Sequence, residues 1–378
     1  MQQFVDHGTI AGAVTLLAHR GQIVSVNAVG YQDLELKIPM DARSIFQVRS
    51  MTKTLTATGI MILLEEGRLL LSDPVEKYVP EFRDVMVAVV REGDRVDSAR
   101  KAMRPVTVYS LLTHTSGMSI GGLQAPQPTL ARSAAAHAKR PLAFDPGDGF
   151  RYSDGGYAVL GRIIEVVAGE PYEEFIAARI LRPLSMHDSF FFPPPEKCDR
   201  IASHYERTDG GLRRYRGYLN PQWNLREGCR AYVDSVPHAG PAWGLFSTAH
   251  DMAAFYQMML NGGSYNGVRV ISPASVEAMT TPHMGERVGG PNELPGPFLP
   301  RFHPFERPGL GWFIASDPRR LQPRGTYGHG GLRGTLGWVD PRNGVIGVLM
   351  IQMENEDGLD APVRNTFIAM AYAALAVP

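Results

Sequence analysis

Residues 45–67, IFQVRSMTKTLTATGIMILLEEG, decide the fold because the chain turns there from a β-type pattern into an apolar helix-type pattern. The first four residues, IFQV, carry the β-type pattern. The stretch from Thr52 to Glu66 is rich in Leu, Ile, Met and Ala, which predicts a helix, and Gly67 is a typical glycine C-cap. Ser50 is therefore expected at the N-terminus of this helix.

Ser50 and Lys53 form an S-x-x-K pattern at this helix start. A spacing of three puts the hydroxyl and the amine on one helix face, one turn apart, so the amine can take the proton of a hydroxyl nucleophile. Free backbone N–H groups and the helix macrodipole favour negative charge near Ser50, which predicts that it forms part of its own oxyanion hole. The alternative is that Ser50 is only an N-cap.

Two other serines compete for the role of nucleophile. Ser98 opens a second S-x-x-K match, which ends at Lys101 inside a charged stretch that indicates a solvated face or loop. Ser119 lies in GMSIG, a formal match to the G-x-S-x-G elbow of α/β-hydrolases, which needs a strand before the serine and a helix directly after it. The residues that follow, GGLQAP, cannot start a helix, so a glycine-rich loop is favoured.

The bulk composition is that of a globular protein. The chain has 378 residues, enough for one large or two ordinary domains, and 44% of them are hydrophobic. Lys plus Arg (38) balance Asp plus Glu (38), so no whole-chain charge favours nucleic acid or an anionic membrane surface. We therefore expect a small-molecule partner.

The cysteines and the two ends of the chain bear on its compartment. Cys198 and Cys229 are too few for a disulfide framework and suit reduced thiols, although the two could be bridged. The N-terminus lacks a basic region followed by an apolar run, so no signal peptide is visible and a cytoplasmic protein is expected; a leader ahead of Met1 would make it periplasmic or secreted. The apolar tail 367–377 is too short to span a bilayer.

Strand patterns stand at both ends of the chain around a helical middle. Strands are predicted at 14–18, 23–26, 334–339 and 345–353, helices at 157–167, 252–260 and 361–375, and mainly helices or loops from Ser72 to Leu260. We therefore predict an α+β fold, an α/β sandwich whose antiparallel sheet of five or more strands is built from N- and C-terminal segments and flanked by helices, with an inserted helical domain. The expected α/β domain is 1–49 with 265–378, the helical domain is 50–264, and the active site lies in the cleft between them. The stretch 289–308 is expected to be a long loop.

Two further motifs lie far from Ser50 in the sequence. Tyr152 and Asp154 stand two apart at a turn that leads into a helix; the alternative to a functional role is a loop tyrosine that packs its ring. His329 precedes Gly330 and Gly331, a glycine pair that borders a strand and lets a ligand approach the backbone closely. Its alternative is a β-bulge with an incidental histidine.

In this order the motifs resemble those of the serine β-lactamase and penicillin-binding-protein superfamily. Within it the chain is most similar to the class C-like branch, and there to the β-lactamase-like carboxylesterases (esterase family VIII). The resemblance covers nearly the whole chain and rests on GAV at 12–14, SMTK at 50–53, LLTHTSG at 111–117, YSD at 152–154, GLFST at 244–248 with DM at 251–252, and HGG at 329–331.

The resemblance implies roles for individual residues. Ser50 is the acylated nucleophile, and Lys53 and Tyr152 transfer the proton, without a decision as to which of the two is the base. The oxyanion hole is made by the backbone N–H groups of Ser50 and Leu332, the latter following the glycine pair on an edge strand. Gln124 matches a polar side chain that lines the substrate cleft.

Two departures from the family pattern bear on the substrate. Asp154 stands where asparagine is common, and its carboxylate can pair with Lys53 but offers no donor to a substrate carbonyl, which disfavours amides. His-Gly-Gly at 329–331 replaces Lys-Thr-Gly, so the fixed cation and the hydroxyl that would hold a substrate carboxylate are missing, which favours neutral substrates. Arg333 restores an anion site if it points into the cleft.

These features predict a serine hydrolase that forms an acyl-enzyme on Ser50, in the first place a carboxylesterase for short-chain or moderately bulky esters. The alternatives are a D-amino-acid peptidase or amidase, a weak β-lactamase, an acyltransferase, and a non-catalytic binding or sensor protein. No metal or organic cofactor is implied, because the histidines lack ligand spacing. Tyr152, Trp243, Trp312 and Phe313 either line an apolar acyl or alcohol pocket or belong to the core.

Overall fold

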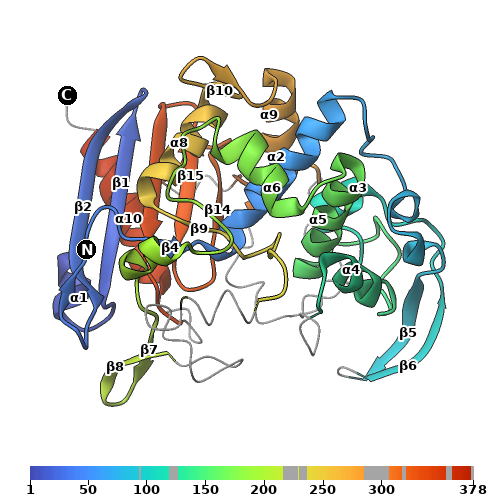
Figure 1. Cartoon of the computed structure of the whole chain (residues 1–378), viewed down its shortest axis with the longest axis horizontal. Helices are drawn as coiled ribbons and strands as arrows, with labels where there is room; N and C mark the ends of the chain where they lie inside the picture. Colours follow the sequence, from blue (N-terminus) through green and yellow to red (C-terminus); the bar gives the residue numbers. More distant parts are fainter. Residues whose placement is uncertain are drawn as a thin grey trace.

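The computed structural model describes residues 1–92, 95–118, 127–215, 229, 236–284, 306–316, 321–354 and 360–375. An eight-stranded antiparallel sheet, in the order β12-β13-β14-β15-β16-β1-β2-β3, forms one side of the molecule, with helices beside it (Figure 1). Its strands are β1 (Gly12–His19), β2 (Gln22–Asp33), β3 (Ile38–Pro39), β12 (Glu306–Pro308), β13 (Phe313–Ala315), β14 (Tyr327–Gly330), β15 (Leu336–Asp340) and β16 (Val345–Met350). Both ends of the chain thus contribute to one sheet, as the sequence predicts.

Strand β1 joins the two halves of this sheet. It pairs with β2 on one side and with the last strand, β16, on the other, where Val14 lies opposite Met350. Its side chains alternate between two apolar clusters: Val14 and Leu16 belong to one, Ala13 and Leu17 to the other. Both faces of β1 therefore need cover.

Two helices supply that cover. α8 (Ala249–Leu260) contacts β1, β15 and β16, and α10 (Asp360–Leu375) places Val363 and Phe367 in the cluster on the opposite face. The structure thus packs α8 on the sheet, although the predicted domain boundaries assign it to the helical segment 50–264. The division into two domains with a cleft between them stays a prediction.

The helical part is built around α2 (Thr52–Glu65), which is buried over most of its length and contacts α5 and α6. A Cβ at Gly59 would lie 3.1 Å from the side chains of Ile164 and Ile176, so this glycine allows close packing. Gly67, with φ at +69°, follows the helix end as predicted. The other helices are α1 (Gln2–Asp6), α3 (Val108–Leu112), α4 (Leu130–Ala138), α5 (Asp154–Ala168), α6 (Tyr172–Ile176) and α9 (Pro273–Thr280).

The middle of the chain also contains hairpins that the predicted pattern of helices and loops misses. They are β5 (Met86–Glu92) with β6 (Arg95–Lys101), and β7 (Tyr205–Thr208) with β8 (Gly211–Arg214). Ser98 is exposed on β6, which confirms the solvated-face interpretation. Two shorter ladders join β4 (Phe46–Gln47) to β9 (Phe246–Ser247) and β10 (Ser264–Tyr265) to β11 (Val268–Arg269).

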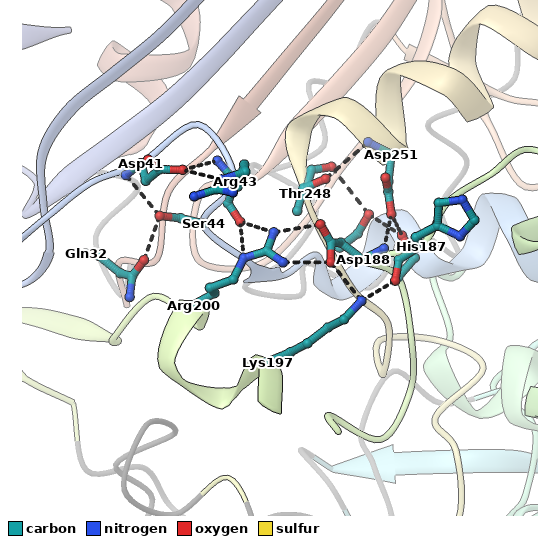
Figure 2. Close-up of polar contacts among 12 residues, drawn as sticks. Gln32, Asp41, Arg43, Ser44, His187, Asp188, Lys197, Arg200, Thr248 and Asp251 are labelled. Carbon is teal, nitrogen blue, oxygen red and sulfur yellow. Dashed lines mark hydrogen bonds and ion pairs between the residues drawn. The ribbon is translucent and has the colours of Figure 1, made fainter. Parts of the chain in front are cut away.

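A polar cluster fixes the start of α8 (Figure 2). The Asp251 carboxylate accepts hydrogen bonds from the Ser189 hydroxyl and the Asp188 N–H, both at 2.8 Å. The Asp188 carboxylate pairs with Lys197 at 2.8 Å and Arg200 at 2.6 Å, and the hydrogen bond from Arg200 is the main cause that lowers the pKa of Asp188 to about 2. The cluster ties the segment 187–200 to α8, next to the β4–β9 ladder that leads to Ser50.

Cys198 and Cys229 form a disulfide, so the expectation of reduced thiols is wrong. Their Cα atoms lie 5.8 Å apart, a spacing that suits a bridge and that two isolated cysteines in a sequence do not reveal.

Some sequence expectations fall on other parts of the chain. Ser119 and most of the predicted loop 289–308 lie outside the described residues, whereas the last three residues of that loop form β12. No helix in the described part of the chain combines the length and the apolar character needed to cross a membrane.

Candidate active site

Ser50 lies in a 3-10 turn, Arg49–Met51, that leads directly into α2. Hydrogen bonds hold this turn on two sides: the Val48 N–H donates to Leu245 O at 2.9 Å, and the Thr335 hydroxyl donates to Val48 O at 3.0 Å. The β4–β9 ladder explains the first contact, because it brings the chain before α8 beside the nucleophile turn. The expected position of Ser50 at a helix start is confirmed.

The amine of Lys53 is enclosed by three partners. Nζ lies 3.2 Å from Ser50 Oγ, 2.7 Å from Asp154 Oδ1 and 2.9 Å from the Ala242 carbonyl oxygen. The Lys53 side chain has 0% of its surface exposed, whereas the Asp154 side chain has 40% exposed. The predicted pairing of Asp154 with Lys53 is therefore present in the structure.

This arrangement suits a neutral amine as a proton acceptor. Burial lowers the pKa of Lys53, and the charge of Asp154 opposes that shift. A neutral amine has two N–H donors, which match Asp154 and the Ala242 carbonyl, and one lone pair, which is left for the hydroxyl proton of Ser50. The same three acceptors match the three protons of the charged amine, so Lys53 can also hold the proton that it takes from Ser50.

Tyr152 completes the group around Ser50. Its hydroxyl is hydrogen-bonded to the Ser50 side chain, and its ring centroid lies 4.7 Å from Lys53 Nζ. Burial, followed by the charge of Asp154, raises the pKa of Tyr152 well above its ordinary value. The raised pKa favours a phenol over a phenolate at Tyr152.

The turn after β14 lies against the turn that carries Ser50. A Cβ at Gly331 would collide with Val48 O and lie 3.2 Å from Arg49 Cβ, so only a glycine permits this close approach. Leu332 follows in the same turn. The role of its N–H in an oxyanion hole stays a prediction, which this approach of the two turns supports.

The same turn is also held by hydrogen bonds from α10. The Arg364 guanidinium, on α10, donates to Gly331 O at 2.6 Å and to Thr335 O at 3.1 Å. The expected edge strand needs correction, because β13 and β12 continue the sheet beyond β14. The ladder between β13 and β14 ends at Gly328, so His329 extends past it.

His329 is buried and neutral. Its Nδ1 lies 2.7 Å from the Gly330 carbonyl oxygen, and because a carbonyl only accepts, Nδ1 carries the proton. Burial, helped by the charge of Lys53, lowers the pKa of His329 to about 3. His329 itself therefore supplies no positive charge at this position.

Arg333, the residue expected to restore an anion site, has other partners. Its guanidinium Nε lies 2.9 Å from Glu354 Oε2, and the group also contacts His204 and lies 5.0 Å from the Tyr215 ring centroid. Because its charge is matched by Glu354, the structure does not favour Arg333 as a carboxylate site.

The aromatic residues divide between site and core. Phe313 joins Tyr152 in a small buried cluster, with 6.3 Å between ring centroids, and half-buried Trp243 lies under the Arg49 guanidinium at 6.0 Å. Trp312 instead stacks on Phe255 in the main core, so a pocket role for it is wrong. Gln124 lies outside the described residues.

Sequence reasoning missed three contributors to this site: Ala242, Thr335 and Arg364. The first two stand close to recognised motifs: Ala242 is two residues before GLFST, and Thr335 follows the glycine-rich turn. This closeness is the signal that could have found them. Arg364 has no such signal. Within the described ranges no group of three or more His, Cys, Asp or Glu side chains is arranged to hold a metal ion.

Comparison with known proteins agrees with these features. The family model described as Beta-lactamase matches residues 1–371. Protein Rv1367c of Mycobacterium tuberculosis is 31% identical over 390 residues, which cover 96% of this chain and 90% of that protein. A putative D-alanyl-D-alanine carboxypeptidase of Salmonella typhimurium is 27% identical over 322 residues, 79% of this chain and 67% of that protein.

Among solved structures, EstCE1, described as a hydrolase with promiscuous acyltransferase activity, is similar with a TM-score of 0.79 and 25% identity, over 97% of this chain and 96% of that one. The family match along the chain and this likeness of fold agree with the sheet, with the S-x-x-K helix start and with the order of the motifs. The chain therefore belongs to the Beta-lactamase family and has the serine-hydrolase fold of the β-lactamase and penicillin-binding-protein superfamily.

Proposed function

We propose that the chain is a serine hydrolase that forms an acyl-enzyme on Ser50, and that it acts as a carboxylesterase on short-chain or moderately bulky esters. The observation that carries this proposal is the environment of Lys53, whose fully buried amine contacts Ser50 Oγ, Asp154 Oδ1 and the Ala242 carbonyl. A non-catalytic protein would have no need to keep a desolvated amine beside a hydroxyl.

In the acylation step Ser50 Oγ attacks the ester carbonyl while Lys53 takes the hydroxyl proton. The backbone N–H groups of Ser50 and Leu332 bind the oxygen on which negative charge develops. The protonated Lys53 then returns its proton to the leaving alkoxide by way of the Tyr152 hydroxyl. Water attacks the acyl-enzyme in the second step with the same groups moving the proton in the reverse sense.

Two side chains support an ester over an amide or an anionic substrate. Asp154 presents a carboxylate, an acceptor that cannot donate to the carbonyl of a peptide or a β-lactam. His329 is neutral because burial lowers its pKa, so it supplies no charge to bind a substrate carboxylate. Both features fit a neutral ester.

Fluorophosphonate labelling followed by mass mapping tests the nucleophile. We expect one adduct on Ser50, none in the Ser50→Ala variant, and an unchanged adduct in Ser98→Ala, the matched control from the second S-x-x-K pattern. An adduct on Ser119, or no adduct on Ser50, would overturn the mechanism.

The substrate class is tested by comparing turnover of p-nitrophenyl butyrate, a chromogenic cephalosporin and a D-alanyl anilide. We expect the ester to have the highest kcat/KM. The highest kcat/KM on the anilide would instead assign the chain to the peptidases, and the highest on the cephalosporin would make it a β-lactamase.

Acyl transfer is the second candidate function, and the partly exposed carboxylate of Asp154 favours it. This carboxylate can accept a hydrogen bond from the O–H of an incoming alcohol. The alcohol then attacks the acyl-enzyme in place of water. Chromatography of the products formed at rising alcohol concentration separates the two functions: a new ester shows transfer, and free acid alone shows hydrolysis.

A further inference from the structure

We propose that His114 is a positioning residue that holds Tyr152 in place for proton transfer, by accepting the backbone N–H of Ser153 at Nδ1. The inference rests on the proposed function, because it assigns a task to Tyr152 in that reaction. Two contacts and one ring placement carry it.

The contacts lie on both sides of Tyr152. His114 Nδ1 accepts the Ser153 N–H at 3.1 Å, and the His114 carbonyl oxygen accepts the Arg151 N–H at 2.8 Å. His114 thus holds the N–H groups of the residues directly before and after the tyrosine. The backbone of Tyr152 has little freedom to rotate while both hydrogen bonds are made.

The ring of His114 also lies against that of Tyr152. The two centroids are 4.5 Å apart with an angle of 34° between the planes, and the His114 ring centroid lies 5.2 Å from that of Tyr157. The Tyr157 hydroxyl donates to Leu112 O at 3.1 Å, which links α5 back to α3 (Figure 1). The Tyr157 ring that contacts the histidine is therefore itself held in place.

The backbone of His114 is held in an uncommon conformation. Its φ is +59°, in the left-handed region, and it directly follows the last turn of α3, where glycine or asparagine is the usual residue. The left-handed conformation is strained for a residue with a side chain, and such strain gathers at functional sites. A glycine would avoid this cost but has no ring to accept the Ser153 N–H.

The proton of His114 must lie on Nε2, because Nδ1 accepts. Burial lowers the pKa of His114 well below its ordinary value. A cationic ring would lose the Ser153 hydrogen bond, so the neutral form preserves the contact.

A matched pair of variants separates positioning from simple packing. In His114→Asn the amide oxygen can take the place of Nδ1, and asparagine tolerates the left-handed conformation. In His114→Gln the amide lies near the place of Nε2 instead, so the Ser153 N–H loses its acceptor. We measure kcat and KM on p-nitrophenyl butyrate, with thermal melting to confirm that each variant folds.

We expect His114→Gln to lower kcat about tenfold or more with KM changed less than about threefold, because a displaced proton donor affects the transition state more than binding. His114→Asn should keep kcat within about threefold of the parent, a rescue that packing alone does not predict. Equal kcat values in the two variants would overturn the proposal.

A second measurement is independent of turnover. In the parent protein with ¹⁵N-labelled histidine, NMR should assign the Nε2–H tautomer to the signal that disappears in His114→Asn; the Nδ1–H tautomer would overturn the proposal. Failure of the proposed function looks different, because the parent would then show no fluorophosphonate adduct on Ser50 whatever the state of His114.

Discussion

The S-x-x-K pattern occurs twice in this chain, at 50–53 and at 98–101, and the two copies have opposite surroundings. The first leads into the buried helix α2, and the second lies on the strand β6, where residues 98–101 are exposed. On a helix a spacing of three places two side chains on one face, whereas on a strand it sends them to opposite faces. The secondary structure, and not the pattern, brings a serine and a lysine together.

The two lysines sharpen the comparison because each has an aspartate at the same distance. Lys53 Nζ lies 2.7 Å from Asp154, and Lys101 Nζ lies 2.7 Å from Asp84. The side chain of Lys53 is 0% exposed, and that of Lys101 is 67% exposed. Burial lowers the pKa of Lys53, whereas the hydrogen bond to Asp84 raises the pKa of Lys101. An ion pair of one length thus produces a candidate base in one place and an ordinary surface pair in the other.

Replacement of Lys53 by methionine should have the largest effect on activity, and it tests the comparison of the two lysines directly. Methionine keeps the apolar stem but removes the proton acceptor, and we expect kcat/KM on p-nitrophenyl butyrate to fall about 10³-fold, a typical size for the loss of a general base. The control Lys101→Met should stay within about twofold of the parent. Equal losses in the two variants would mean that burial does not distinguish the lysines.

Asp154→Asn tests the partner of the buried lysine. We expect kcat/KM on the ester at neutral pH to fall about tenfold, the size of one lost charge-assisted hydrogen bond. The Asp154 charge raises the pKa of Lys53, so its removal lowers that pKa further. Lys53 must be neutral to accept a proton, and activity therefore falls as the pH drops through its pKa. The acidic limb of the kcat/KM profile should move to lower pH.

Asp84→Asn is the matched control for this measurement and should leave the profile in place. A limb that moves to higher pH in Asp154→Asn would exclude Lys53 as the titrating base. Asp154→Asn also supplies an amide donor beside the nucleophile, so the ratio of anilide to ester turnover should rise in this variant.

Arg364→Lys should give a smaller effect, because it alters the turn beside Ser50 and not the reacting groups. Lysine keeps the charge but lacks the planar fork that reaches both Gly331 O and Thr335 O. We expect kcat to fall about fivefold, equivalent to about 1 kcal/mol for one lost hydrogen bond, with little change in KM. The control is Arg342→Lys, because the Arg342 side chain is exposed. A loss confined to KM would argue against a role of Arg364 in shaping the turn beside Ser50.

The features that the sequence predicts well are those with a local cause. The apolar run after Ser50 and Gly67 at its end define α2 almost to the residue. The nearly continuous apolar runs in β1 and β16 reflect their place in the middle of a sheet that is covered on both faces. The pairing of Lys53 with Asp154 was also predictable, because it follows from motif positions in a known family.

The features that the sequence does not predict depend on tertiary packing. Arg364 lies on a helix without a motif, and its contacts exist because α10 packs on the sheet against β16. The direction of Arg333 is set by its left-handed φ of +81° and by Glu354, neither of which a sequence pattern shows. The disulfide likewise depends on where the folded chain brings Cys198 and Cys229.

Ser98→Ala should have the smallest effect of all. It tests the comparison of the two S-x-x-K patterns at the exposed copy. The side chain is exposed on a hairpin far from the sheet in Figure 1, so its removal should change the free energy of unfolding by less than about 0.5 kcal/mol. Chemical denaturation measures this change, and the kcat/KM on p-nitrophenyl butyrate should match that of the parent. A loss of activity without a loss of stability would show that the exposed serine takes part in the reaction, and the contrast in burial between the two patterns would then no longer explain which of them is the site.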